Sequence, residues 1–173
     1  ELAVFHHLLS SGEYTHRKHA LLASYLDRIV LSVFRQLAIT RFEKALYCLR
    51  ENRSLSEEEI CGQWQKETAD LYGQSVHLPL HYPWGWAHIP HLIHIPFYCY
   101  TYVFGNLTAI TLYERVKQSE GRFMEALLTL CRAGGSRRPG DILREIGLDP
   151  LKPDLWQTAL EHVRGFVEQI RVN

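Results

Sequence analysis

The chain has 173 residues, of which 46% are hydrophobic and 22% are charged. This apolar content is enough for a buried core and excludes an intrinsically disordered tail. The 19 basic and 19 acidic residues cancel, and without a basic stripe we expect no nucleic-acid partner. The segment closest to a membrane span, Ile93 to Leu112, is interrupted by Pro96. It predicts a buried helix, and we expect no membrane partner.

Two helices are predicted in the first third of the chain. Leu2 to Leu9 is apolar, and Ser10-Ser11-Gly12 predicts the loop that ends it. The helical pattern has already begun at Glu1 without a start signal, so we expect an upstream segment of the same protein to precede it. One uninterrupted pattern from Tyr14 to Leu49 then predicts a long helix.

The apolar residues of this long helix fall on two faces. The first face carries Leu22, Leu26, Ile29, Val33 and Leu37, and the second carries Val30, Phe34 and Ala38. We expect both faces to be buried, one of them against the upstream segment. The chain on its own should therefore expose apolar surface and tend to associate.

A capping box at Ser56-Glu57-Glu58-Glu59 predicts a helix from Glu57 to about Tyr72. The next stretch, Gly73 to Pro96, is rich in proline, histidine and tryptophan. Its prolines prevent a regular helix interior, and its aromatic residues argue against disorder. We expect an ordered loop that leads into a tyrosine-bearing helix.

Glycine and proline signals separate the remaining helices, which are predicted at about 97–118, 121–132, 139–147 and 154–170. No strand pattern competes with them. The predicted fold class is all-α.

The cysteines lack the C-x-x-C spacing of zinc or redox motifs; they are Cys48, Cys61, Cys99 and Cys131. Scattered cysteines of this kind are typical of reduced, mostly buried thiols. They favour a cytoplasmic protein.

The strongest chemical signal is a histidine turn followed by alternating tyrosines. At helical spacing, Tyr98 and Tyr102 share one face, whereas Tyr100 points away. A phenol stays protonated at neutral pH, so it can donate a hydrogen bond. Two phenols beside the imidazole of His91 could hold a peptide carbonyl and the oxyanion that it becomes. The same residues could also be core groups with a structural role only.

The same segment carries a longer motif, composed of Ile89-Pro90-His91, Pro96-Phe97-Tyr98, Tyr100, Tyr102 and Gly105. It resembles the I-P-H-F…P-F-Y-x-Y-x-Y-x-x-G segment of oligoendopeptidase F proteins, zinc peptidases related to thimet oligopeptidase. Leu130-Cys131-Arg132-Ala133-Gly134-Gly135-Ser136 resembles their L-x-A-G-G-S element with one extra residue. Glu1-Leu2-Ala3-Val4-Phe5 with Leu8-Leu9 resembles the end of their E-x-A-S-x-F-G-E-x-L-x-F-x-x-L-L helix. The resemblance covers essentially the whole chain.

This resemblance implies that residues 1–173 are the C-terminal part of a peptidase catalytic domain. Glu1 matches the second glutamate of the family helix and is expected to support the site from outside the reacting groups. The zinc-binding glutamate would lie seven residues before it, and the H-E-x-x-H helix earlier still. H-E-x-x-H is absent from this chain. The implied zinc cofactor is therefore expected upstream, and this chain alone is expected to be inactive.

The resemblance also implies metal-assisted hydrolysis of oligopeptides. His91, Tyr98 and Tyr102 would polarise the scissile carbonyl and orient the peptide. His94, Tyr100 and Gly105 are expected to contact the substrate beside them.

Two alternatives stay open. A metal could be bound by three histidines spaced by three residues, His88, His91 and His94. Pro90 lies between the first two and opposes a continuous helix that would place all three on one face. The chain could also be a non-catalytic helical module, used for peptide binding or as a scaffold, that lacks the metal centre. His6 and His7 lie on the first helix, at positions that are not ligands in the family.

Overall fold

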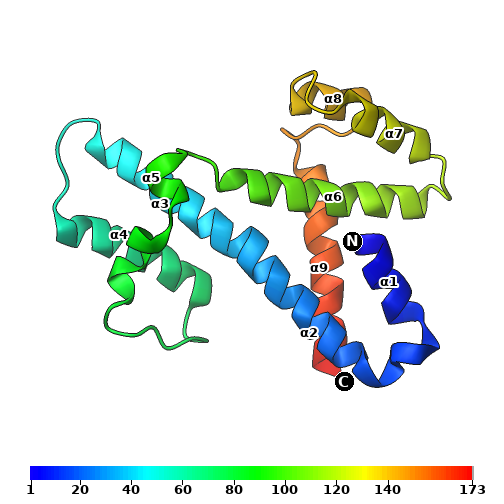
Figure 1. Ribbon diagram of the computed structural model, residues 1–173, viewed down its shortest axis with the longest axis horizontal. Helices are drawn as coiled ribbons and strands as arrows, with labels where there is room; N and C mark the ends of the chain where they lie inside the picture. Colours follow the sequence, from blue (N-terminus) through cyan, green and yellow to red (C-terminus); the bar gives the residue numbers. More distant parts are fainter. Residues whose placement is uncertain (173) are drawn as a thin grey trace. The chain divides into compact units, whose positions relative to one another are not determined.

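The computed structural model describes residues 1–172, and this range contains helices and loops without a strand (Figure 1). The prediction of an all-α fold is confirmed. Within these residues, no helix is both long and apolar enough to cross a membrane. Contacts divide the chain into two compact units. One unit contains Glu1–Arg28 and the residues from Gly105 onward, and the other contains Ile29–Phe104.

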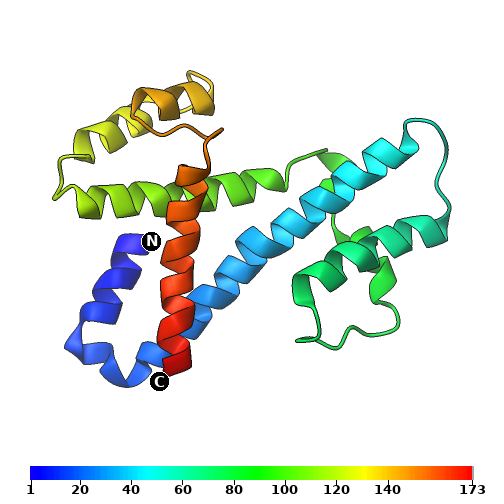
Figure 2. The same ribbon diagram turned by 180° about the vertical axis from the view of Figure 1, so that it is seen from behind.

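The first unit brings the two ends of the chain together. Its elements are α1 (Leu2–Ser10), the 3-10 turn η1 (Gly12–Arg17), most of α2 (Lys18–Ile29) and of α6 (Tyr100–Gln118), α7 (Met124–Ala133), α8 (Pro139–Glu145) and α9 (Pro153–Val172). Figure 2 shows α1, α6 and α9 of this unit from behind. Phe5 of α1 meets Phe166 of α9 edge to face, with ring centroids 5.5 Å apart. The buried Thr111 hydroxyl of α6 donates to the Leu155 carbonyl at 2.6 Å.

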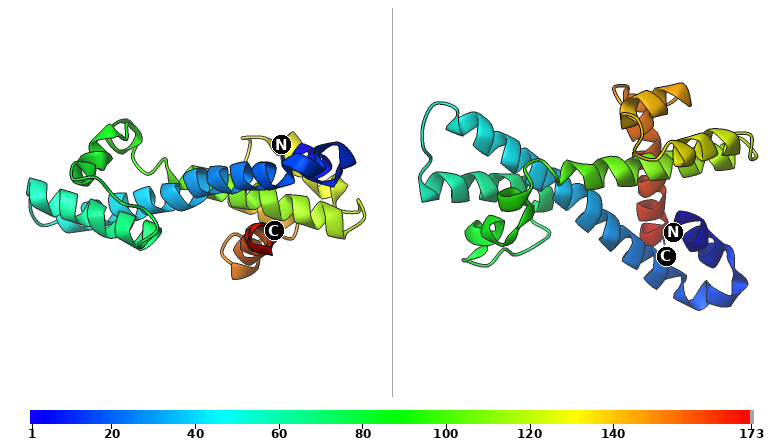
Figure 3. Two further views of the ribbon diagram at one scale, coloured as in Figure 1. Left: turned by 90° about the horizontal axis from the view of Figure 1, so that it is seen from below. Right: turned by 45° about the horizontal axis from the view of Figure 1, so that its top comes forward.

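The second unit is built around a helical hairpin. It contains the π-helical turn η2 (Val30–Phe34), α3 (Arg35–Arg50), α4 (Glu57–Tyr72), the 3-10 turn η3 (Tyr82–His88) and the short α5 (His91–His94). α3 packs against α4, and α4 packs against η3. Figure 3 shows this arrangement from two further sides.

The predicted capping box starts α4 as expected. The Glu59 amide donates to the Ser56 hydroxyl at 3.3 Å, and the Ser56 amide donates to the Glu59 carboxylate at 2.9 Å. Arg53 donates two further hydrogen bonds to that carboxylate, at 2.8 and 2.6 Å. The bonds from Arg53 have the largest effect, followed by the bond from the Ser56 amide, and they lower the pKa of Glu59 to about 2. Glu59 therefore remains charged at the helix start over the whole neutral and mildly acidic range.

The long helical pattern differs from the prediction in two respects. It begins with the 3-10 turn η1, and η2 inserts one π-helical turn between α2 and α3. Leu22 and Val33 are buried, but Val30 of the second face is 39% exposed and Leu37 is 43% exposed. The chain therefore exposes apolar surface along this helix, as expected of it on its own, and burial of one face against an upstream segment stays a prediction.

Two other boundaries were predicted too early. The tyrosine-bearing helix starts at Tyr100, because Phe97 has a φ of 56° that no helix accommodates. The next helix starts at Met124, because Glu120 and Gly121 both have positive φ. The cysteines are all free as predicted, but only Cys61 and Cys99 are buried. The prediction of buried thiols is wrong for Cys48 and Cys131.

Candidate functional site

A cluster of buried side chains in the second unit fixes the segment that carries the candidate site. It consists of Ile39, Phe42, Trp64, Ile89 and Cys99. Trp64 donates its indole N–H to the Tyr82 carbonyl at 3.1 Å and so anchors η3. Ile89 and Cys99 lie on either side of α5 in the sequence, and both are buried. The loop between them is thereby held at both ends on α3 and α4.

Glu43 holds the turn that precedes the tyrosines. Its side chain is buried, with 3% of the residue exposed, and its carboxylate accepts the Phe97 amide at 2.8 Å. Phe97 takes a left-handed backbone conformation, which a side chain of this size rarely adopts. Its ring packs on Tyr47 of α3 with centroids 4.9 Å apart. The carboxylate and the ring contact together stabilise the strained turn.

The turn brings His91, Tyr98 and Tyr102 together. The imidazole of His91 stacks on the Tyr98 ring, with centroids 5.3 Å apart and an angle of 7° between the planes. Tyr102 stands perpendicular to both rings, 5.9 Å from His91 and 5.4 Å from Tyr98. The Tyr102 hydroxyl lies 3.5 Å from His91 Nε2. The three rings lie together as expected, but Tyr98 lies in the turn before α6 and only Tyr102 is on the helix, so the expected shared helix face is wrong.

The surroundings of this cluster act on the pKa of Tyr102. Loss of solvent contact, and next the neighbouring Tyr98, raise the pKa of Tyr102 above its ordinary value. Both tyrosines are nevertheless more than one-third exposed. The cluster therefore presents hydrogen-bonding side chains at an accessible surface, which is the arrangement that an anionic or strongly polarised oxygen requires.

The other predicted residues lie outside this cluster. His94 ends α5 and is exposed, and Tyr100 begins α6 with 52% of its surface exposed. Gly105 and Glu1 belong to the first unit. A side chain at Gly105 would meet no neighbour within 4 Å, so sterics do not require glycine there. Glu1 is exposed and forms an ion pair with Arg28.

A shallow hollow of about 540 Å³ lies next to this segment on α3. It is lined by Glu43, Leu46, Tyr47, Arg50, Glu51 and Leu92. Glu43 also accepts the Phe97 amide, and Leu92 directly follows His91 in the sequence. The hollow therefore borders the segment that carries the cluster, although none of the three clustered rings lines it.

The candidate site does not fit a metal ion. It offers one imidazole and two phenols, and no carboxylate stands among them. Among the side chains that the structure describes, which leave out residues 13, 172 and 173, the one group of three with metal-ligating geometry is His6, Glu114 and His162 of the first unit. His88, His91 and His94 do not form such a group, so the alternative of a metal bound by these histidines is not supported.

Glu43 is the residue of the site that sequence reasoning missed. It occupies the apolar stripe of α3 with Ile39, Phe42 and Leu46, at spacings of three and four. A carboxylate in such a stripe is a usable signal, because charged groups are rarely buried without a partner. Its partner, the Phe97 amide 54 residues later, is visible only in the folded chain.

Replacing Glu43 by alanine should destabilise the second unit by about 1–3 kcal/mol, because the Phe97 amide would lose its partner. Glu43→Gln retains an acceptor oxygen and should cost less. Urea unfolding followed by circular dichroism measures both variants. Equal losses in the two variants would mean that the charge, and not the bond to Phe97, is what matters.

Comparison with known proteins gives consistent matches. The model of peptidase family M3 matches residues 1–162. Group B oligopeptidase PepB of Streptococcus agalactiae is 27% identical over 154 residues, covering 88% of this chain and 25% of that protein. An oligoendopeptidase F homolog of Borreliella burgdorferi is 22% identical over 166 residues, covering 95% of this chain and 28% of that protein.

A solved structure agrees with these relatives. The crystal structure of a candidate peptidase from Chlamydophila abortus has a TM-score of 0.79 and 26% identity, covering 87% of this chain and 25% of that one. The chain thus spans about a quarter of the length of the relatives it matches. The resemblance to oligoendopeptidase F proteins is confirmed, and the chain belongs to peptidase family M3.

Proposed function

We propose that this chain is part of a zinc metalloendopeptidase that hydrolyses peptide bonds in oligopeptides. Its contribution is a wall of hydrogen-bond donors formed by His91, Tyr98 and Tyr102. The observation that carries the proposal is the mutual contact of these three rings at an accessible surface. The names of the relatives, oligopeptidase and oligoendopeptidase, support the choice of substrate class.

The chemistry of the three rings suits the tetrahedral intermediate of peptide hydrolysis. This intermediate carries a negative oxygen, and donors aimed at that oxygen lower the barrier most when they are already in place. The stacking of His91 on Tyr98 and the perpendicular Tyr102 limit the motion of all three rings. His94 and Tyr100, which are exposed next to the cluster in sequence, are proposed to contact the rest of the peptide.

The zinc ion of the proposed peptidase is assigned to ligands outside this chain. The candidate site lacks a carboxylate and the chain lacks H-E-x-x-H. The proposed partner is the upstream segment of the same protein, which would carry these ligands. The exposed apolar residues of the long helix, such as Leu31 and Leu37, are the proposed contact surface for that segment.

Hydrolysis of an internally quenched fluorescent peptide tests the proposal. The chain alone should be inactive, and the chain mixed with or joined to its upstream segment should hydrolyse the peptide. A zinc chelator should abolish this activity, and added zinc should restore it. If the joined protein binds the peptide with no hydrolysis in zinc, the chain is part of a peptide-binding or scaffold module instead.

A further inference from the structure

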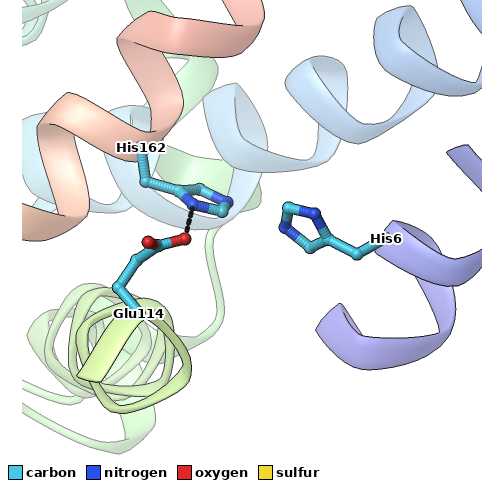
Figure 4. A group of neighbouring side chains, drawn as sticks. All are labelled: His6, Glu114 and His162. Carbon is cyan, nitrogen blue, oxygen red and sulfur yellow. Dashed lines mark hydrogen bonds and ion pairs between the residues drawn. The ribbon is translucent and has the colours of Figure 1, made fainter. Parts of the chain in front are cut away.

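Three side chains that are far apart in the sequence meet inside the first unit. His6 comes from α1, Glu114 from α6 and His162 from α9, and one potential ligand atom of each lies within 4.8 Å of the others. Figure 4 shows the two imidazole rings pointing toward each other, with Glu114 beside His162. Among the residues whose side chains the structure describes, this is the one group of histidine, cysteine and acidic residues with such geometry.

Both histidines leave one nitrogen without a partner. The His162 side chain is 4% exposed, and its Nε2 atom is buried with no hydrogen bond. His6 Nε2 is also buried and also has no hydrogen-bond partner. Buried polar atoms are nearly always paired, and an unpaired one is costly. Two such atoms on facing rings therefore indicate a missing ligand that both could bind.

Glu114 prepares His162 for this role. Its carboxylate lies 2.7 Å from His162 Nδ1, so the proton of the ring is placed on Nδ1 and the lone pair on Nε2. A carboxylate behind a histidine in this way is the usual outer partner of a metal-binding imidazole. It fixes the orientation of the ring and makes the ligand nitrogen more basic.

His6 is also held in the form that binds metals. Burial, and then the neighbouring His162 and Lys117, lower the pKa of His6, while Glu114 opposes them. A neutral imidazole is the ligating form. Tyr25 also faces the group, 6.3 Å from His162 between ring centroids. Burial raises the pKa of Tyr25 to about 12, and its buried hydroxyl also has no hydrogen-bond partner.

The spacing of the two rings suits one ion between them. Their centroids are 5.2 Å apart, and the planes are inclined by 59°. Two imidazoles bound to one tetrahedral zinc ion, through bonds of about 2.0–2.1 Å, have centroids about 5 Å apart. The aromatic rings of Phe166 and Tyr113 pack on the pair and hold its rings in place, and solvent would supply the remaining ligands of a tetrahedral ion.

We propose that His6 and His162 bind a divalent transition-metal ion such as Zn²⁺ through their Nε2 atoms, with Glu114 orienting His162. Nitrogen ligands favour zinc, cobalt or nickel over magnesium and calcium. The ion would join α1 to α9 and so tie the two ends of the chain. This site is built entirely from residues of this chain, and it does not depend on the proposed peptidase activity.

Metal titration of the 173-residue chain tests this site, because the chain carries no H-E-x-x-H motif that would compete. Zn²⁺ should bind saturably with one ion per chain and raise the thermal unfolding midpoint. Co²⁺ should bind in its place and give visible absorption typical of tetrahedral coordination. His6→Gln and His162→Gln should each abolish binding, and Glu114→Gln should weaken it about 10- to 100-fold.

The matched control is His7→Gln, which removes the exposed histidine next to His6 on the same helix. It should leave Zn²⁺ affinity unchanged. The proposal is overturned if the unaltered chain binds no Zn²⁺ saturably, a result that needs no variant to fold. It is overturned equally if folded His6→Gln retains full affinity, or if His7→Gln loses as much affinity as His6→Gln.

Discussion

Replacing Tyr102 by phenylalanine in the proposed peptidase should lower kcat by about 100- to 1,000-fold, with a much smaller change in KM. Phenylalanine keeps the ring that stands edge-on to His91 and Tyr98, so the packing of the cluster is retained. Only the hydroxyl that lies 3.5 Å from His91 Nε2 is removed. A donor that acts on the oxyanion contributes mainly to the transition state, and its loss therefore appears in kcat.

The measurement is the steady-state hydrolysis of a quenched fluorescent peptide by the protein joined to its upstream segment. Tyr98→Phe is measured beside it and should also reduce kcat. The matched control is Tyr47→Phe, which removes a phenol from α3 in the same unit while keeping the ring that packs on Phe97. Unchanged kcat in both Tyr98→Phe and Tyr102→Phe would show that the three rings are structural. A loss in Tyr47→Phe as large as in Tyr102→Phe would point to a disturbed fold.

Features that depend on neighbouring residues could be predicted from the sequence. The capping box at Ser56 and the start of α4 at Glu57 follow from bonds that span three residues. Helical spacing predicted that Tyr98 and Tyr102 lie close together, and the two rings do meet, although Tyr98 lies in the turn before α6. The all-α class likewise follows from periodicity, which each helix carries within itself.

Features that depend on distant residues could not be predicted in this way. The start of α6 is delayed to Tyr100 because Glu43 holds Phe97 in a left-handed turn from 54 residues away. The stacking of His91 on Tyr98 depends on the same turn. His6 was noticed in the sequence, but its partners Glu114 and His162 come from helices more than a hundred residues later. The burial of each helix face similarly depends on what packs against it.

The loop that leads to the candidate site depends on one side chain of α4. Trp64 is 1% exposed, meets Phe42 edge to face at 5.2 Å and donates to the Tyr82 carbonyl at 3.1 Å. A Cβ atom on Gly85 would lie 3.0 Å from the indole nitrogen, so η3 is packed directly on this ring. No smaller side chain can fill this space and also keep the hydrogen bond.

Trp64→Ala should therefore destabilise the second unit by about 3–5 kcal/mol, since it leaves a large cavity and an unpaired carbonyl. Urea unfolding followed by far-ultraviolet circular dichroism measures the loss. The matched control is Trp84→Ala, because Trp84 is 44% exposed and its removal should cost less than about 1 kcal/mol. Similar losses in the two variants would contradict the assignment of Trp64 as the anchor of η3. If only Trp64→Ala is destabilised, the segment that carries His91 is held in place by a residue outside the candidate site. Substitutions of Trp64 should then reduce peptidase activity because they disturb the fold.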